Sequence, residues 1–213
     1  MSKSVAVLGL GKYGRSLAEN LYLMGADVLA VDSDPDLIEE FADKCTSAVC
    51  ANLANEDEVV ALGLKSMDIV VCAMGGNLAA SIMAVAVAKE QGVPIVVAKA
   101  STPRMASLLK KVGANKVLDP EGQGGHRSAQ ILMSSLFKDF FELDSNMFMI
   151  EMAPKKEWIG KTVLELNLRK TMQLNVVAVK SKGGLWHFVE PTSRFTEKSV
   201  VLIVVEKKDL HRI

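Results

Sequence analysis

The sequence begins with the stretch Val5-Ala6-Val7-Leu8-Gly9-Leu10-Gly11-Lys12-Tyr13-Gly14, an apolar run followed by glycines in the pattern GxGxxG. The apolar run predicts a buried strand, and the residues after Gly11 have the spacing of a helix. In such a strand–turn–helix unit the first glycine permits a tight turn. The second lets a pyrophosphate approach the backbone, and the third lets the helix pack on the strand. The stretch predicts a phosphate cradle; a glycine-rich turn without a ligand is the alternative.

Five more short apolar runs follow, up to about residue 118, with helical segments between them. The runs are 28–31, 47–50, 69–72, 95–98 and 116–118, and the helical segments are 13–24, 35–43, 55–62, 78–91 and 103–112. Alternating strands and helices are typical of a parallel sheet with helices on its faces. We therefore expect an α/β fold with a complete Rossmann-type sheet.

Residues 128–143 carry aromatic and aliphatic side chains on one stripe of an expected long helix. These side chains are Leu132, Leu136, Phe137, Phe140 and Phe141. Because the sheet before it is already complete, we expect the segment from about 126 to 143 to be a dimerising helix. Packing against its own domain is the alternative.

The last part of the sequence predicts a small α+β domain. Strands are expected at 147–152, 176–180 and 200–206, with a short helix at 160–168. Lys182-Gly183-Gly184 predicts a hairpin turn, with residues 185–189 on its far side. The expected domains are therefore 1–143 and 144–213.

Composition excludes several classes of protein. The 25 Lys and Arg residues balance the 25 Asp and Glu residues, which argues against a nucleic-acid partner. The three cysteines, Cys45, Cys50 and Cys72, have no CxxC spacing and fit buried thiols in a reducing cytosol. The first strand follows Met1 too closely for a signal peptide, so we expect a cytoplasmic protein. Residues 69–88 carry no charge, but their glycine-containing turn argues against a membrane span.

Polar residues near the ends of the predicted strands suit a nucleotide. Asp32 ends the second strand, 18 residues after Gly14, where a carboxylate can bind a ribose diol and would repel a 2′-phosphate. Asn77 lies in the turn after the fourth strand, where it could contact ribose or phosphate or cap the next helix. Lys12 lies inside the cradle and could meet a terminal phosphate, which a dinucleotide lacks.

The chain resembles the regulator of potassium conductance family of the Ktr and Trk type, along nearly its whole length. The resemblance rests on 5–14, 29–32, Ala51-Asn52-Leu53-Ala54, Ala73-Met74-Gly75-Gly76-Asn77, Val97-Ala98-Lys99-Ala100, 112–114, Asp119-Pro120-Glu121 and 160–169. It implies a Rossmann domain, a smaller C-terminal domain, homodimers and octameric rings. It also implies a potassium-translocating membrane subunit as partner, so that the chain would lie on the cytosolic face of the cell membrane.

The resemblance to the Ktr type implies ATP or ADP as ligand, and the resemblance to the Trk type implies NAD or NADH. Lys12 takes the place of a family arginine that reaches the γ-phosphate; lysine keeps the charge without the bidentate fork. Lys99 would lie near the nucleotide, and Glu121 would help hold Mg²⁺ on the phosphates; a solvated carboxylate is the alternative for Glu121. The predicted nucleotide site comprises Gly9, Gly11, Lys12, Tyr13, Gly14, Asp32, Ser33, Asn52, Leu53, Ala73, Met74, Gly75, Asn77, Lys99 and Glu121.

The C-terminal domain resembles those Ktr domains that hold cyclic di-AMP at a dimer interface. The resemblance implies that Arg169 would contact phosphate and Asn175 adenine, with Pro191 closing the pocket. Asn167 departs from this pattern, which often has aspartate there. An ordinary structural domain is the alternative.

The sequence does not predict an enzyme. His126, His187 and His211 have no predictable carboxylate or nucleophile partner, so neither a catalytic triad nor a two-histidine metal site is expected. An NAD-dependent oxidoreductase, the alternative function, would also need a substrate-binding domain with a catalytic acid. The predicted function is a nucleotide-sensing regulatory subunit.

Overall fold

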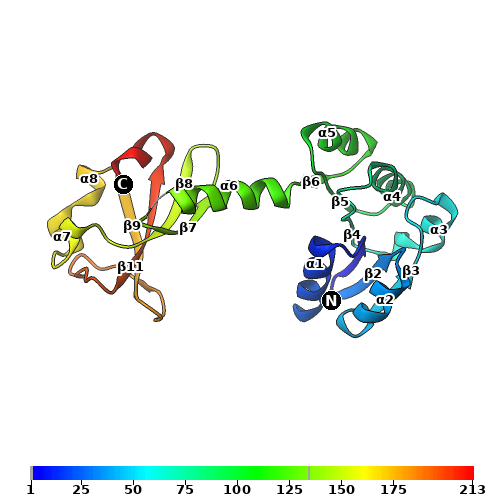
Figure 1. The fold of residues 1–213 in the computed structure, drawn as a ribbon, viewed down its shortest axis with the longest axis horizontal. Helices are drawn as coiled ribbons and strands as arrows, with labels where there is room; N and C mark the ends of the chain where they lie inside the picture. The colour runs from blue at the N-terminus through cyan, green and yellow to red at the C-terminus, as the bar shows by residue number, and fades with distance from the viewer. Residues whose placement is uncertain (1, 134) are drawn as a thin grey trace. The chain divides into compact units, whose positions relative to one another are not determined.

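The computed structural model describes residues 2–133 and 135–213. By their internal contacts the residues divide into two compact units, Met1–Gly122 and Gln123–Ile213. Figure 1 shows the elements of both units.

The first unit is built on a six-stranded parallel sheet in the order β3-β2-β1-β4-β5-β6 (Figure 1). Its strands are β1 (Ser4–Leu8), β2 (Asp27–Asp32), β3 (Ser47–Cys50), β4 (Ile69–Cys72), β5 (Ile95–Lys99) and β6 (Lys116–Leu118). Its helices are α1 (Lys12–Leu23), α2 (Pro35–Phe41), η1 (Ala42–Lys44), α3 (Glu56–Ala61), η2 (Leu64–Ser66), α4 (Leu78–Glu90) and α5 (Pro103–Val112). This is the strand order of a Rossmann sheet, so the predicted α/β fold is confirmed.

The sheet of the first unit is buried on both faces. Successive residues of β1 belong to different core clusters: Ala6 and Leu8 to one, Val5 and Val7 to the other. Side chains of α3, α4 and α5 cover the first face, and side chains of α1 and α2 cover the second. Burial on both faces explains why the strands read as continuous apolar runs rather than as alternating patterns.

Side-chain caps fix where several helices of the first unit begin. Asp34, Asn55, Asn77 and Thr102 each accept a hydrogen bond from a backbone amide in the first turn of α2, α3, α4 and α5, respectively. Each cap satisfies a donor that the helix itself leaves unpaired. The caps place these helix starts just beyond the carboxyl ends of the preceding strands.

No helix among the described residues is long and apolar enough to cross a membrane. The uncharged run 69–88 divides between β4, a turn and α4, as the sequence predicted.

The second unit contains a five-stranded antiparallel sheet in the order β10-β9-β11-β8-β7. Its strands are β7 (Phe137–Glu142), β8 (Met147–Met152), β9 (Leu174–Ser181), β10 (His187–Phe188) and β11 (Ser199–Glu206). Its helical segments are η3 (Lys156–Trp158), α7 (Val163–Leu166), α8 (Leu168–Thr171) and η4 (Lys207–Arg212). Trp158 and Phe195 are buried in a core separate from those of the first unit. The hairpin predicted at Lys182-Gly183-Gly184 joins β9 to β10.

The predicted helix over 128–143 is wrong in its second half. The helix is α6, which begins at Pro120 and ends at Met133, and residues 137–142 form β7, which pairs with β8. Phe140 is buried and Phe141 partly exposed, an alternation that suits a strand better than a helix. Ser134, inside the predicted helix, lies outside the described residues. Because β7 belongs to the second sheet, the units divide at 122–123 rather than at 143.

The predicted helix over 160–168 is two short helices. Asn167 has φ +43° and separates α7 from α8. Asparagine is one of the few residues that tolerate this left-handed conformation, so the helical stretch breaks there.

Phe195→Ala should destabilise the second unit by about 3–5 kcal/mol, because it empties a fully buried site beside Trp158. Trp158 and Trp186 both lie in the second unit, whereas Tyr13 and Tyr22 lie in the first. Tryptophan fluorescence should therefore show that the second unit of the variant unfolds at a lower urea concentration than that of the wild type. Phe188→Ala, at an exposed phenylalanine of the same unit, serves as control and should change the unfolding free energy by less than about 0.5 kcal/mol. A tryptophan midpoint equal to that of the wild type would contradict the assigned core.

Candidate functional site

The three cradle glycines have different physical roles. A side chain at Gly14 would place Cβ 1.9 Å from the Gly9 carbonyl oxygen, and one at Gly9 would place Cβ 2.8 Å from Cγ of Met74. Gly9 also has φ +97°, and its amide donates to the Val31 carbonyl oxygen at 2.7 Å. At Gly11, by contrast, an added Cβ would meet no atom within 4 Å. The backbone conformation therefore favours glycine at position 9 and packing requires it at position 14, whereas the second glycine leaves the turn open to a ligand.

The open turn leads directly into α1. The first intrahelical bond joins the Arg15 amide to the Gly11 carbonyl oxygen, so the earlier amides of the first turn have no acceptor within the helix. These amides and the positive end of the helix dipole make the turn a favourable place for an anion. Lys12, the first residue of α1, is exposed and adds a cation to it.

Asp32 ties the cradle to the second strand. Its Oδ2 accepts from the Leu10 amide at 2.6 Å, and its Oδ1 accepts from the Asp34 amide at 3.1 Å. A carboxylate has about four acceptor sites, so both oxygens can still accept from a ribose diol. Sequence reasoning predicted the ribose contact but missed that Asp32 also holds the cradle in place.

Lys99 occupies the centre of a cluster beside the cradle. Its ammonium forms an ion pair with Glu121 and lies 5.6 Å from the ring centre of Tyr13. Its stem packs so closely on Gly75 that an added Cβ there would lie 2.9 Å from Lys99 Cε. The side chain of Lys99 is only 13% exposed, whereas that of Glu121 is 64% exposed. The sequence predicted that Lys99 and Glu121 lie near the site, but not that they pair.

Two pKa shifts reflect this cluster. The hydrogen bond from Lys99 holds the pKa of the Glu121 carboxyl below its usual range. Burial, and secondarily the negative charge of Glu121, raises the pKa of the Tyr13 hydroxyl. Glu121 is therefore a carboxylate and Tyr13 a neutral phenol at neutral pH.

The turn after β4 is braced by two serines that sequence reasoning missed. Ser81 donates to the Met74 carbonyl oxygen at 2.9 Å, and Ser101 donates to the Gly75 carbonyl oxygen at 2.9 Å. A serine at position 81, within the apolar stretch 78–88 of this helix, was the available signal for one of them. Asn77 is the N-cap of α4, because its Oδ1 accepts from the Ala80 amide at 3.0 Å.

The remaining predicted residues of the first unit lie after the ends of β2, β3 and β4. Asn52 braces its own loop: its Oδ1 accepts from the Ala54 amide, and its backbone amide donates to Glu58. Leu53 and Ala73 are buried, and Ser33 is exposed. In a parallel sheet these strand ends share one edge, where open α/β sheets bind ligands.

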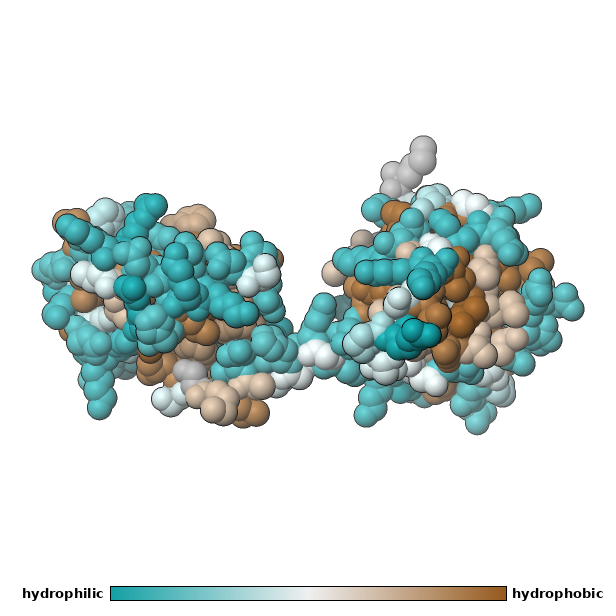
Figure 2. Space-filling view, turned by 90° about the horizontal axis from the view of Figure 1, so that it is seen from above, coloured by the Kyte–Doolittle hydropathy of each residue, from teal (hydrophilic) through white to brown (hydrophobic). Residues whose placement is uncertain are grey.

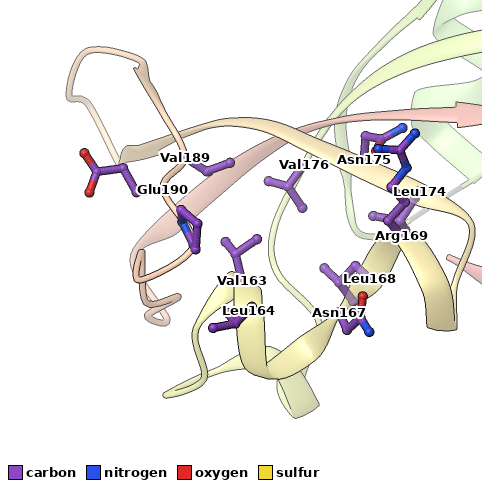
Figure 3. A pocket seen from close by; sticks show the side chains of 11 residues that line it. Val163, Leu164, Asn167, Leu168, Arg169, Leu174, Asn175, Val176, Val189 and Glu190 are labelled. Atoms are coloured by element: carbon purple, nitrogen blue, oxygen red, sulfur yellow. The ribbon is translucent and has the colours of Figure 1, made fainter.

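The second unit holds a separate pocket of about 300 Å³ (Figure 3). Arg169, Asn175 and Pro191 all line it, together with Asn167 and Glu190. The apolar part of the lining is Val163, Leu164, Leu168, Leu174, Val176 and Val189. The pocket brings the three predicted residues together, and it combines an apolar lining with a guanidinium and amide groups.

Among residues 2–133 and 135–213, no group of three or more histidine, cysteine, aspartate or glutamate residues could hold a metal ion. A divalent cation at the cradle would therefore need a ligand to supply most of its oxygens.

Comparison with known proteins matches residues 5–120 to the TrkA-N domain family. Ktr system potassium uptake protein A of Bacillus subtilis (strain 168) is 30% identical over 99% of this chain and 95% of its own length. Ktr system potassium uptake protein C of the same organism is 31% identical over 100% of this chain and 96% of its own length.

Solved structures have the same fold over 99% of the chain. The GsuK RCK domain aligns with a TM-score of 0.67 at 16% identity, and the GsuK channel bound to NAD with 0.68 at 16% identity. The chain spans 46% and 38% of the lengths of those two chains. At this identity the likeness establishes the fold alone. Because the family model matches more than half of the residues and the Bacillus proteins align over nearly the full length, the chain belongs to the TrkA-N family, with Ktr potassium uptake proteins as relatives.

Proposed function

We propose that this protein is a nucleotide-sensing regulatory subunit of a Ktr-type potassium uptake system. The observation that carries the proposal is the open turn at Gly11, with the start of α1 behind it and Lys12 beside it. Its relatives of matching length are named as potassium uptake proteins. The chain would bind a nucleotide at the cradle and alter the activity of a potassium-translocating membrane subunit.

ATP and ADP are the nucleotides that the charges around the cradle favour. Lys12 is exposed at the start of α1 and can attract a terminal phosphate. Asp32 lies at the end of β2, where it would repel a 2′-phosphate. NAD or NADH is the alternative, supported by the fold shared with a channel whose structure was solved bound to NAD.

Mg²⁺ could accompany the phosphates. Glu121 is the carboxylate that would contribute a ligand oxygen, with phosphate and water oxygens completing the shell. In the structure Glu121 is paired with Lys99, so a cation would have to displace that ammonium.

A homodimer and an octameric ring are the proposed assembly. On the face of the first unit that Figure 2 shows, apolar residues gather in a patch among polar ones. Leu132 and Met133, at the end of α6, are 84% and 87% exposed, and we propose them for the dimer contact expected from the sequence.

The proposed location is the cytoplasm. There the chain would be held at the cytosolic face of the membrane by its potassium-translocating partner subunit.

An NAD-dependent oxidoreductase is less well supported. The three histidines all belong to the second unit, where His126 faces Glu142 at 3.8 Å and the His211 ring contacts the Lys208 carbonyl oxygen. Neither contact includes a nucleophile or a set of metal ligands, so neither forms a triad or a metal site.

Lys12→Ala should reduce the ratio of ATP affinity to ADP affinity by about tenfold while leaving ADP binding nearly unchanged. The reason is that Lys12 would mainly meet the terminal phosphate. Calorimetric titration with each nucleotide measures the ratio, and mass spectrometry of gently purified protein identifies the retained nucleotide. Lys3→Ala removes the same charge at the opposite end of β1 and should leave the ratio unchanged. Equal losses for ATP and ADP in Lys12→Ala would contradict this role.

Cys50 should react with maleimide much faster than Cys45 and Cys72, and ADP should slow its reaction several-fold. The expectation of three buried thiols is wrong for Cys50, which is exposed and lies opposite Asp32 in the β2–β3 register. The other two thiols are buried. Burial raises the pKa of the Cys72 thiol to about 12, so this thiol stays protonated and unreactive. Mass spectrometry of labelled peptides follows each site, and Cys50→Ser should remove the fast phase. Equal labelling rates with and without saturating ADP would place the nucleotide elsewhere.

The second-unit pocket supports a second ligand, cyclic di-AMP. Because the pocket joins Arg169, Asn175 and Pro191, it offers a cation for phosphate and an amide for adenine beside apolar side chains. An ordinary structural domain would have no such ligand.

Calorimetry of the full chain with cyclic di-AMP should show binding that Arg169→Ala weakens by about tenfold or more, through loss of a charge-assisted contact. The adjacent Lys170→Ala is the control, because Lys170 is exposed and does not line the pocket. No heat with the wild-type protein, or equal weakening by both substitutions, would count against this assignment.

A further inference from the structure

Helix α6 (Pro120–Met133) has unusually little to stabilise it. None of its described residues is buried, although most helices in proteins depend on packing of an apolar face. It also contains Gly122, Gly124 and Gly125, and glycine lowers helix stability relative to alanine at each interior position. Ile131, near the end of α6, packs partly buried against the core of the second unit, so the earlier turns of the helix are held by contacts other than an apolar face.

The glycines of α6 differ in their surroundings. At Gly122 an added Cβ would lie 2.0 Å from Oδ2 of Asp119, so a side chain there would displace the Asp119 carboxylate. Asp119 caps the helix: its Oδ1 accepts from the Gly122 amide at 2.8 Å. Gly124 and Gly125 meet no atom within 4 Å and do not have positive φ, so neither sterics nor backbone conformation requires glycine there. The main physical effect of this pair is to weaken the helix.

Charged contacts hold α6 on both sides of the glycine pair. Before the pair, Glu121 forms its ion pair with Lys99. After the pair, Arg127 binds Asp139 of β7 through two hydrogen bonds, at 2.8 and 2.5 Å, and stacks 4.4 Å from the ring centre of Phe141. The bidentate contact belongs to the second unit and the Glu121 contact to the first. Gly124 and Gly125 therefore form the weak segment between two attachments.

The attachment at Glu121 is also next to the cradle. The Lys99 ammonium lies 5.6 Å from the Tyr13 ring centre, and Tyr13 belongs to the first turn of α1, where the amides would meet a phosphate. A phosphate there would be a second anion for the same ammonium. Glu121 can give up the contact at small cost, because its side chain is 64% exposed and water can replace Lys99.

We propose that a phosphate in the cradle competes with Glu121 for Lys99, and that this exchange loosens the first turns of α6 at Gly124 and Gly125. The inference rests on the proposed nucleotide binding and adds the route by which binding reaches the second unit. When the Glu121 contact is lost, the first turns of α6 keep the Asp119 cap, but their glycines make them weak. Nucleotide binding and helical order in α6 then oppose one another.

The test is amide hydrogen exchange of residues 122–126 in the full chain, with and without ADP, in buffer free of divalent cations. Calorimetry on the same preparation establishes whether ADP binds. In the wild-type protein saturating ADP should speed exchange in this segment by about tenfold, the effect of one charge-assisted contact. Glu121→Gln should exchange at the faster rate already without ADP and respond no further. Its ADP affinity should equal or exceed that of the wild type, because Lys99 is free.

Two further variants distinguish the proposed exchange at Lys99 from a general loss of helical order in α6. Gly124→Ala combined with Gly125→Ala should slow exchange by about tenfold or more with and without ADP, since alanine strengthens the helix. Glu142→Gln removes a carboxylate that faces α6 beyond the glycine pair, at His126, and should keep the full response to ADP.

Bound ADP with unchanged exchange at 122–126 would overturn the inference and leave the proposed function standing. A wild-type response in Glu121→Gln would overturn it as well. If calorimetry shows no ADP binding, the proposed function is contradicted. The proposed competition for Lys99 is then contradicted as well.

Discussion

The close contact between the first turn of α1 and the end of β1 determines the rest of the site. Gly14 lies so near the Gly9 carbonyl oxygen that no other residue fits, and this contact directs the start of the helix at the carboxyl edge of the sheet. Asp32 fixes the same turn from the side by accepting from the Leu10 amide. With both constraints satisfied, Gly11 is left exposed, in front of amides that the helix does not use. An anion site thus follows from packing requirements within the protein.

A second consequence is that charges gather where the backbone already favours an anion. Lys12 starts α1, and Lys99 ends β5, so both come to the edge of the sheet that holds the cradle. Glu121 neutralises Lys99 and at the same time lies in the first turn of α6, where a carboxylate suits the helix dipole. The Lys99 ammonium therefore lies beside both Tyr13, in the first turn of α1, and Glu121, in the first turn of α6.

The strands of the first unit could be predicted to within one or two residues, because burial on both faces leaves continuous β-branched runs with glycine or proline near their ends. The glycine turn and the position of Asp32 at the end of the second strand could also be predicted, because both depend on local sequence. Helix α6 could not be placed, because its three glycines concealed it even though Asp119 and Pro120 are a common helix start. β7 was missed because its pairing with β8 is a tertiary contact. The Lys99–Glu121 pair joins residues 22 positions apart, and nothing in the local pattern indicates it.

Gly11→Asp tests the central claim most directly, because it places a carboxylate in the open space of the cradle without a steric clash or a positive φ. Calorimetry should show that ADP affinity falls by about a hundredfold or more, through repulsion and blocked access to the amides, while the melting temperature stays near that of the wild type. Unchanged ADP affinity in a folded Gly11→Asp protein would show that the nucleotide does not bind at this cradle.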